Sequence, residues 1–266
     1  MFAASQQKST AALVLYFTAG DGGAEATVEH IVAAAEAGAD LIELGVPFSD
    51  PSADGPVIEA AMVRALNSGM RPDTLGKTLQ IARAVRLRTP IPIVLFGYYN
   101  PLLQRGPQRL AQEAADAGID GLLTVDLPPE HDDLLGPSLN TQGLASIRLL
   151  APTTPVDRAQ SIATSASGFL YYVSLAGVTG AATLDPATVK ERLGVLKSAT
   201  AGLPVCVGFG VRSPQDVAAL SSFVDGVVVG SAIVKLLYET ATLPPAEQRA
   251  RLVERVRALK AACKRG

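Results

Sequence analysis

The chain has 266 residues, 48% of them hydrophobic and 18% charged, with a formal net charge of −2 at pH 7. This composition supplies a large apolar core, and the balanced charge without a Lys/Arg-rich block argues against nucleic acid or an anionic membrane surface as a partner. Two cysteines exclude a disulfide framework. The polar N-terminus and the lack of any apolar stretch near the ~18 residues of a membrane span predict a globular, cytoplasmic protein.

Eight short apolar runs recur along the chain. They are rich in β-branched and aromatic residues and apolar on both faces, which is typical of strands buried in a parallel sheet. The runs cover residues 12–18, 41–46, 93–98, 121–126, 146–151, 169–175, 204–208 and 226–230.

Amphipathic, alanine-rich patterns lie between these runs and predict helices. Two of them, 27–37 and 107–117, are each followed by a glycine, the residue that tolerates the left-handed conformation of a helix end. Ser213 with Asp216 three residues later is a helix start with a capping pattern. Further helices are expected over residues 57–68, 74–88 and 245–263.

Eight strands that alternate with helices in a chain of this length favour a closed TIM (β/α)8 barrel with extra helices over a doubly wound sheet. The segments AGADLIELG and AGIDGLLTVD, and more loosely FVDGVVVG, repeat one connection from a helix end to a strand. No internal linker is visible. We therefore expect residues 1–266 to form a single domain.

The second strand carries a carboxylic acid inside an apolar run. In this fold, active sites are built from the C-terminal ends of the strands and the loops that follow them. Glu43 should therefore point into the barrel mouth, where burial would raise its pKa. The alternative is a structural glutamate paired with a neighbouring cation.

Two further carboxylates, Asp50 and Asp54, follow in a loop restricted by proline and glycine. Either could serve only as a turn or helix-cap residue. A buried strand glutamate and a loop aspartate on one barrel rim can, however, form a general acid/base pair.

Glycine pairs end the seventh and eighth strands, where TIM barrels often bind phosphate. The seventh runs into Gly208 and Gly210, and the eighth into Gly230 and Ser231, at a helix start. Backbone N–H groups there can approach an anion. Residues 176–183, which follow the sixth strand, are small and include two glycines, which favours a lid over an incidental loop.

Other residues that often carry chemistry are interpreted as structural. His30 and His131 lie in helical patterns away from the strand ends, and no metal-ligand cluster is present in the sequence. Tyr98, Tyr99, Tyr171 and Tyr172 lie at or inside strands, where most tyrosines serve packing.

Six motifs give the chain a family resemblance. LIELGVPFSDPSADGPVI, GYYNP, DLPPE, SLAGVTG, GFGVRSP and GSAIVK occur in this order along the chain. In order and spacing they resemble the tryptophan synthase alpha chain family. The resemblance covers nearly the whole sequence, and LGVPFSDPxADGP is highly specific.

The resemblance implies a retro-aldol cleavage of indole-3-glycerol phosphate to indole and glyceraldehyde-3-phosphate, with no metal and no organic cofactor. Glu43 matches the acid/base that handles the proton at indole C3 and the glycerol hydroxyl. Asp54 matches the residue that hydrogen-bonds the indole N–H. Protonation at C3 makes the ring an electron sink, and an anion near N1 supports the developing positive charge.

Substrate-binding and partner residues are also implied by the resemblance. Tyr171 matches a tyrosine that lines the site near Glu43, and Thr179 matches a lid threonine that positions Asp54. Phosphate contacts are implied for Gly180, Gly210, Gly230 and Ser231. A contact surface for the tryptophan synthase beta chain, in an α2β2 complex, is implied for Asp50, Asn100 and Pro101.

The sequence departs from the family pattern at a few positions. They are Gly22, Ser52, Val125 and Leu175. These departures affect the expected lid energetics and the loop after the fourth strand, not the reaction. Two other functions remain open: another phosphate-binding barrel acting on sugar phosphates, and a non-catalytic subunit that regulates a partner.

Overall fold

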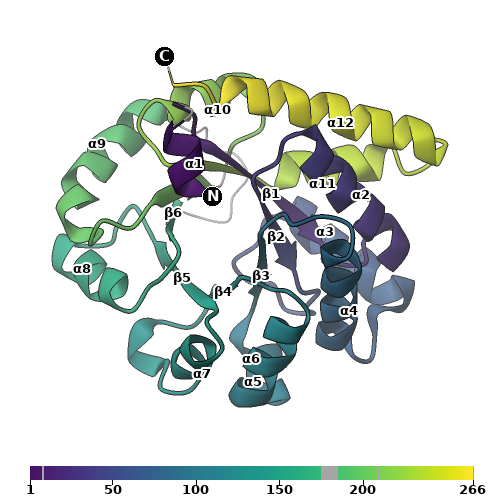
Figure 1. Ribbon diagram of the computed structural model, residues 1–266, viewed down its shortest axis with the longest axis horizontal. Helices are drawn as coiled ribbons and strands as arrows, with labels where there is room; N and C mark the ends of the chain where they lie inside the picture. Colours follow the sequence, from purple (N-terminus) through teal and green to yellow (C-terminus); the bar gives the residue numbers. More distant parts are fainter. Residues whose placement is uncertain (8, 175–184, 209, 266) are drawn as a thin grey trace.

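The eight predicted strands form a closed, all-parallel barrel in which each strand pairs with its neighbours in chain order, from β1 to β8. The computed structural model describes residues 1–7, 9–174, 185–208 and 210–265. The predicted TIM barrel is confirmed, with the helices arranged around the strands (Figure 1). The strands are β1 (Ala12–Thr18), β2 (Leu41–Gly45), β3 (Ile93–Gly97), β4 (Gly121–Thr124), β5 (Ala145–Leu150), β6 (Leu170–Val173), β7 (Val205–Gly208) and β8 (Gly226–Val229).

Most strands end earlier than the sequence predicts. β1 has the expected bounds, but β2, β3 and β4 lose one or two residues at their C-terminal ends. The lost residues begin the loops at the barrel rim. Asp126, for example, accepts a hydrogen bond from the backbone N–H of Tyr99 at 2.7 Å instead of continuing β4.

The helices confirm the predicted ring and add elements to it. The capping box of Ser213 and Asp216 is present, and Gly38 has the left-handed conformation with φ 111°. The helices are α1 (Phe2–Gln7), α2 (Ala24–Ala37), α3 (Pro56–Ala65), α4 (Thr74–Arg86), α5 (Tyr99–Arg105), α6 (Pro107–Asp116), α7 (Leu135–Thr141), α8 (Val156–Thr164), α9 (Pro186–Leu196), α10 (Pro214–Ser221), α11 (Ser231–Glu239) and α12 (Pro245–Ala262).

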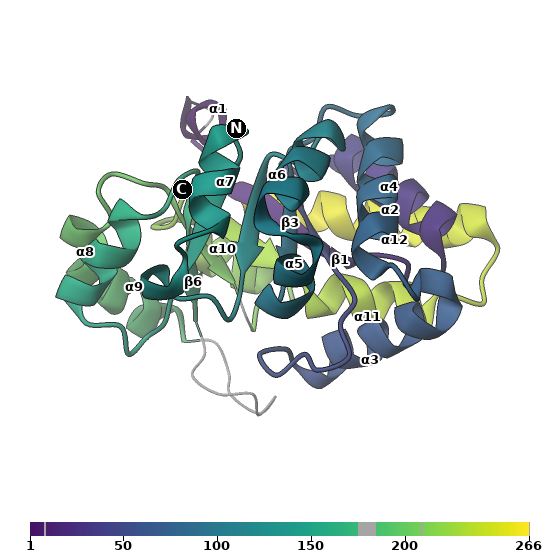
Figure 2. The same cartoon turned by 90° about the horizontal axis from the view of Figure 1, so that it is seen from below.

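The short helix α1 was not expected from its polar sequence. The ring of Phe2 packs against Phe169 inside the barrel, with the ring centroids 5.6 Å apart. This tertiary contact, rather than helix propensity, explains why so short a helix forms. Figure 2 shows α1 at one end of the barrel and α3 and α11 toward the other.

Two apolar clusters divide the core. One fills the space between the barrel and the surrounding helices and includes Leu13, Ile42 and Leu95. The other fills the barrel interior and includes Tyr16, Phe96, Tyr171 and Cys206, together with Ile58 and Met62 of α3 and Val234 of α11. The helices α3 and α11 therefore close over part of the barrel mouth, beside the loops that follow β1, β2 and β8.

The connection repeated in the sequence corresponds to one recurring clamp. Just before each of β2, β4, β6 and β8, one side chain accepts a hydrogen bond from a backbone N–H. That N–H lies at or near the start of the strand that comes one earlier in the chain. The donor and acceptor pairs are Leu13 and Asp40 at 2.7 Å, Ile93 and Asp120 at 2.8 Å, Ser146 and Ser167 at 2.9 Å, and Val205 and Asp225 at 3.0 Å. These clamps hold the strands in register at the end of the barrel opposite the mouth.

Long apolar helices are missing from the described ranges. None of the helices there has the length and apolar character needed to cross a membrane.

Candidate active site

Glu43 lies at the centre of β2 and points into the barrel. Ile42 and Leu44 on either side of it belong to the outer apolar cluster, so alternation along the strand turns Glu43 inward. Its exposed fraction is 1%. Within the described part of the chain it forms no salt bridge, and its Oε1 atom has no hydrogen-bond partner. The alternative of a structural ion pair is therefore not supported.

Burial changes the acidity of this group. Removing a carboxylate from water disfavours its charged form, and burial raises the pKa of Glu43 from its ordinary value of 4.5 to about 8. Glu43 is consequently a proton donor near neutral pH and can still lose its proton within an accessible range. These are the properties of a general acid/base.

Asp54 is the second buried carboxylate of the site. It lies in the loop between β2 and α3, has an exposed fraction of 5%, and does not cap α3, whose N-cap is Gly55. Its Oδ2 atom accepts a hydrogen bond from the Tyr98 hydroxyl at 2.7 Å. Burial raises the pKa of Asp54 to about 6, and the bond from Tyr98 acts in the opposite direction. Asp54 is therefore mostly ionised near neutral pH.

Tyr98 is a site residue that the sequence interpretation assigned to packing. Its hydroxyl accepts a hydrogen bond from the Ala53 N–H at 2.9 Å while it donates to Asp54. Phe48 stacks on its ring at 5.2 Å between centroids. Tyr98 thus holds both the backbone and the carboxylate of the Asp54 loop. Its place directly after β3, at the rim, is the signal that could have identified it.

Two tyrosines occupy space left free by glycines on neighbouring strands. A Cβ atom at Gly45 would lie 2.1 Å from the Tyr16 hydroxyl, and one at Gly208 would lie 2.0 Å from the Tyr171 hydroxyl. Both phenols are buried, and after burial itself the charge of Glu43 is among the causes that raise the pKa of each. The structure therefore places Tyr171 and Glu43 in the same barrel interior.

The predicted phosphate residues that are described lie on the same rim. Gly210 follows β7 with φ 80°. Gly230 is the N-cap of α11, and Ser231 begins that helix. A Cβ atom at Gly230 would meet the Cβ of Tyr16 at 3.5 Å, so this turn adjoins the barrel interior. Thr179 and Gly180, with the rest of the predicted lid, lie outside the described residues.

The residues predicted to face a partner follow two neighbouring strands. Asp50 is exposed in the loop after β2. Asn100 and Pro101 lie in the first turn of α5, directly after β3. The parallel pairing of β2 and β3 places the loop after β2, which also carries Asp54, beside the start of α5 at the mouth.

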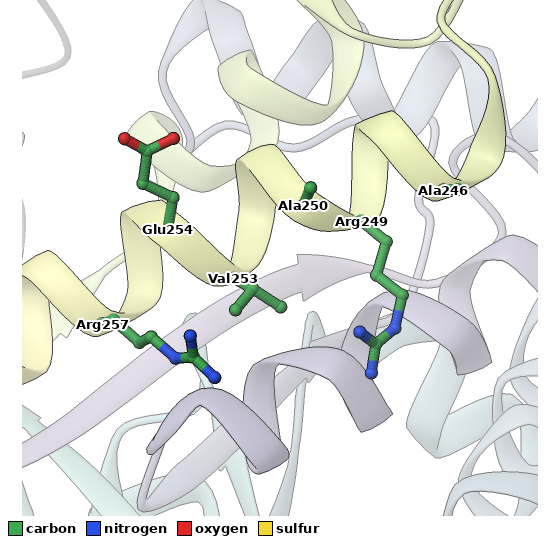
Figure 3. A pocket seen from close by; sticks show the side chains of 6 residues that line it. All are labelled: Ala246, Arg249, Ala250, Val253, Glu254 and Arg257. Carbon is green, nitrogen blue, oxygen red and sulfur yellow. The ribbon is translucent and has the colours of Figure 1, made fainter.

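A hollow on the outside of the molecule is a different feature. It has a volume of about 510 Å³ and lies along α12, where Figure 3 shows Arg249 and Arg257 on one side of the helix and Glu254 on the other. Arg249 is already paired with Glu36 of α2. This hollow includes none of the barrel-mouth residues. In the described ranges no group of His, Cys, Asp and Glu side chains is arranged to hold a metal ion.

Comparisons with known proteins point to one family. The sequence model of the family described as "Tryptophan synthase alpha chain" matches residues 2–264. The chain is 47% identical over 265 residues to the tryptophan synthase alpha chain of Rhizorhabdus wittichii, covering 94% of this chain and 95% of that protein. It is 49% identical over 238 residues to the alpha chain of Desulfatibacillum aliphaticivorans, covering 90% and 88%.

Solved structures agree with the sequence comparison. The alpha subunit of tryptophan synthase from Legionella pneumophila superposes with a TM-score of 0.88 at 35% identity, covering 98% of this chain and 96% of that chain. A chain of Mycobacterium tuberculosis tryptophan synthase superposes with a TM-score of 0.88 at 34% identity, covering 100% and 97%.

The raised pKa of Glu43 predicts how stability depends on pH. Between pH 4.5 and about 8 the folded protein keeps a proton on Glu43 that the unfolded chain has lost. The contribution of Glu43 to the free energy of unfolding therefore falls as pH rises through this window and levels off above it. Glu43→Gln removes the titration, so its Tm relative to wild type should be higher at pH 9 than at pH 5. Calorimetry at both values measures this, and a Tm difference independent of pH would contradict a buried, titrating Glu43.

Proposed function

Because the chain belongs to the tryptophan synthase alpha chain family, we propose that Glu43 and Asp54 together catalyse that family's reaction. The protein is a lyase, and the reaction is the aldol-type cleavage of indole-3-glycerol phosphate to indole and glyceraldehyde-3-phosphate in tryptophan biosynthesis. The observation that supports this role is the pair of buried carboxylates in different environments. Glu43 has an oxygen without a described partner, and Asp54 is held by Tyr98.

The different pKa values of Glu43 and Asp54 fit two different roles in the reaction. Glu43, with a pKa of about 8, donates its proton to C3 of the indole ring. Asp54, with a pKa of about 6, remains charged and accepts the hydrogen bond of the indole N–H as positive charge develops on the ring. The Glu43 carboxylate then takes the proton of the hydroxyl on the neighbouring side-chain carbon. The C–C bond breaks, the aldehyde and indole form, and Glu43 is protonated again.

We assign substrate binding to the rest of the rim. Gly210, Gly230 and Ser231 would hold the phosphate through backbone N–H groups and the start of α11, which favours an anion. Tyr171 would line the pocket for the ring. Thr179 and Gly180 are proposed as lid contacts on the family resemblance alone.

The partner and setting are also proposals. The tryptophan synthase alpha chain family works with a beta chain. The exposed residues Asp50 and Asn100 and the partly buried Pro101 at the mouth suit a docking surface in an α2β2 complex. Indole is apolar and would otherwise be lost by diffusion. We further propose that residues 1–266 form one domain and that the protein works in the cytoplasm, without a metal or organic cofactor.

Substitution of the two carboxylates tests the catalytic assignment. Glu43→Gln should abolish indole release while substrate binding persists, since an amide cannot transfer the proton. Asp54→Asn should lower kcat on the order of 10²-fold or more. Steady-state indole release and calorimetric binding of indole-3-glycerol phosphate measure both effects. Near-normal turnover in Glu43→Gln would remove Glu43 from the mechanism.

A charge at the α11 turn tests the phosphate site. A Cβ atom at Gly230 makes only an ordinary contact with Tyr16, so the fold accommodates a side chain there. Gly230→Asp should raise KM steeply by repelling the phosphate, and the neutral control Gly230→Asn should raise it much less. If the two variants have equal KM values, the phosphate binds elsewhere.

Addition of the beta chain tests the docking surface. The complex should have the light-scattering mass of an α2β2 assembly, and indole release by the alpha chain should rise when it forms. Asp50→Lys should weaken assembly without changing the turnover of the isolated chain. A chain that is fully active alone and stays monomeric with the beta chain present would instead be an independent indole-releasing lyase.

A further inference from the structure

Tyr16 is a buried phenol at the centre of the site for which the proposed reaction has no role. It lies on β1 in register with Glu43 on β2, and both side chains point into the barrel. Its hydroxyl extends over Gly45, two residues beyond Glu43 on the same strand and toward the mouth. The hydroxyl therefore lies at the layer between Glu43 and the loop that carries Asp54.

The hydrogen bonds of this phenol leave its proton available. The Thr18 hydroxyl, also buried, donates to the Tyr16 oxygen at 3.4 Å. A phenol that accepts one bond still carries an O–H donor. The titratable groups that interact with Tyr16 are Glu43, Asp54, Tyr98 and Tyr171. Of these, only the two carboxylates are pure acceptors when ionised.

Glu43 is the carboxylate that needs a donor. Asp54 already receives the Tyr98 hydroxyl, whereas the Oε1 atom of Glu43 has no partner among the described groups. A buried carboxylate without a donor is costly once it is charged. The titratable groups facing Glu43 are Tyr16 from β1, Tyr171 from β6 and Cys206 from β7. None of these is a cation.

We propose that Tyr16 is a positioning residue for Glu43, whose hydroxyl, supported by Thr18, donates a hydrogen bond to the Glu43 carboxylate when that group is ionised. This inference rests on the proposed role of Glu43. The bond would favour the ionised form that takes the substrate hydroxyl proton and would fix the orientation of the carboxylate. A chain of hydrogen bonds in which Thr18 donates to Tyr16 and Tyr16 donates to the Glu43 carboxylate would also strengthen each bond.

The ionisation of Glu43 itself provides the test. Protein labelled with ¹³C at the glutamate carboxyl is titrated by NMR, and the Glu43 signal is assigned by its absence from Glu43→Gln. Tyr16→Phe keeps the ring and its edge contact with Phe96 but lacks the donor. Glu43 should then titrate about one pH unit higher than in wild type. Thr18→Val should move it in the same direction by less.

A matched control separates the donor from general packing. Tyr172 is also a buried tyrosine of the barrel, but it lies on the outer face, so Tyr172→Phe should leave the Glu43 titration unchanged. With KM unchanged, kcat of Tyr16→Phe should fall, and the descending limb of its pH profile, which reports loss of the Glu43 proton, should move with the NMR value. An unchanged Glu43 titration in Tyr16→Phe, or an increase only in Tyr171→Phe, would overturn the inference. If Glu43→Gln is inactive but either of these outcomes is found, the proposed function stands and only the role of Tyr16 is wrong.

Discussion

The site depends on one constraint, the burial of a carboxyl group inside a closed barrel. Eight parallel strands with apolar side chains on both faces leave Glu43 in an interior lined by aromatic groups, with an exposed fraction of 1%. Burial raises its pKa to about 8, which makes an ordinary glutamate a proton donor near neutral pH. The same burial costs stability at alkaline pH, so the proposed catalytic group is retained at the expense of the fold.

The barrel accommodates this group through paired large and small residues. Gly45 and Gly208 leave room for the hydroxyls of Tyr16 and Tyr171, which place buried polar atoms at the mouth end of the strands without enlarging the barrel. At the rim, Tyr98 joins β3 to the loop after β2 and holds Asp54. Strand register thus fixes Glu43, and a loop fastened to the next strand fixes Asp54. The two carboxylates acquire different acidities because their environments differ.

Much of this arrangement could be predicted from the sequence. Strand number, barrel closure and the inward direction of Glu43 follow from local apolar patterns and the alternation of side chains along a strand. The capping box at Ser213 follows from local spacing in the same way. The hydrogen bond from Tyr98 to Asp54 joins residues 44 positions apart. The ring contact of Phe2 with Phe169 joins residues that are still farther apart in the sequence. No local pattern encodes such contacts, so Tyr98 was assigned to packing and α1 was missed.

Proton exchange at indole C3 tests the central claim, that the buried Glu43 transfers this proton. The reverse reaction allows the purified chain to be incubated with indole and glyceraldehyde-3-phosphate in D₂O, and the C3 proton signal of indole can be followed by NMR. The wild-type chain should replace this proton with deuterium, and Glu43→Gln should not, although it binds both compounds. Exchange at the wild-type rate in Glu43→Gln would show that another group carries the proton.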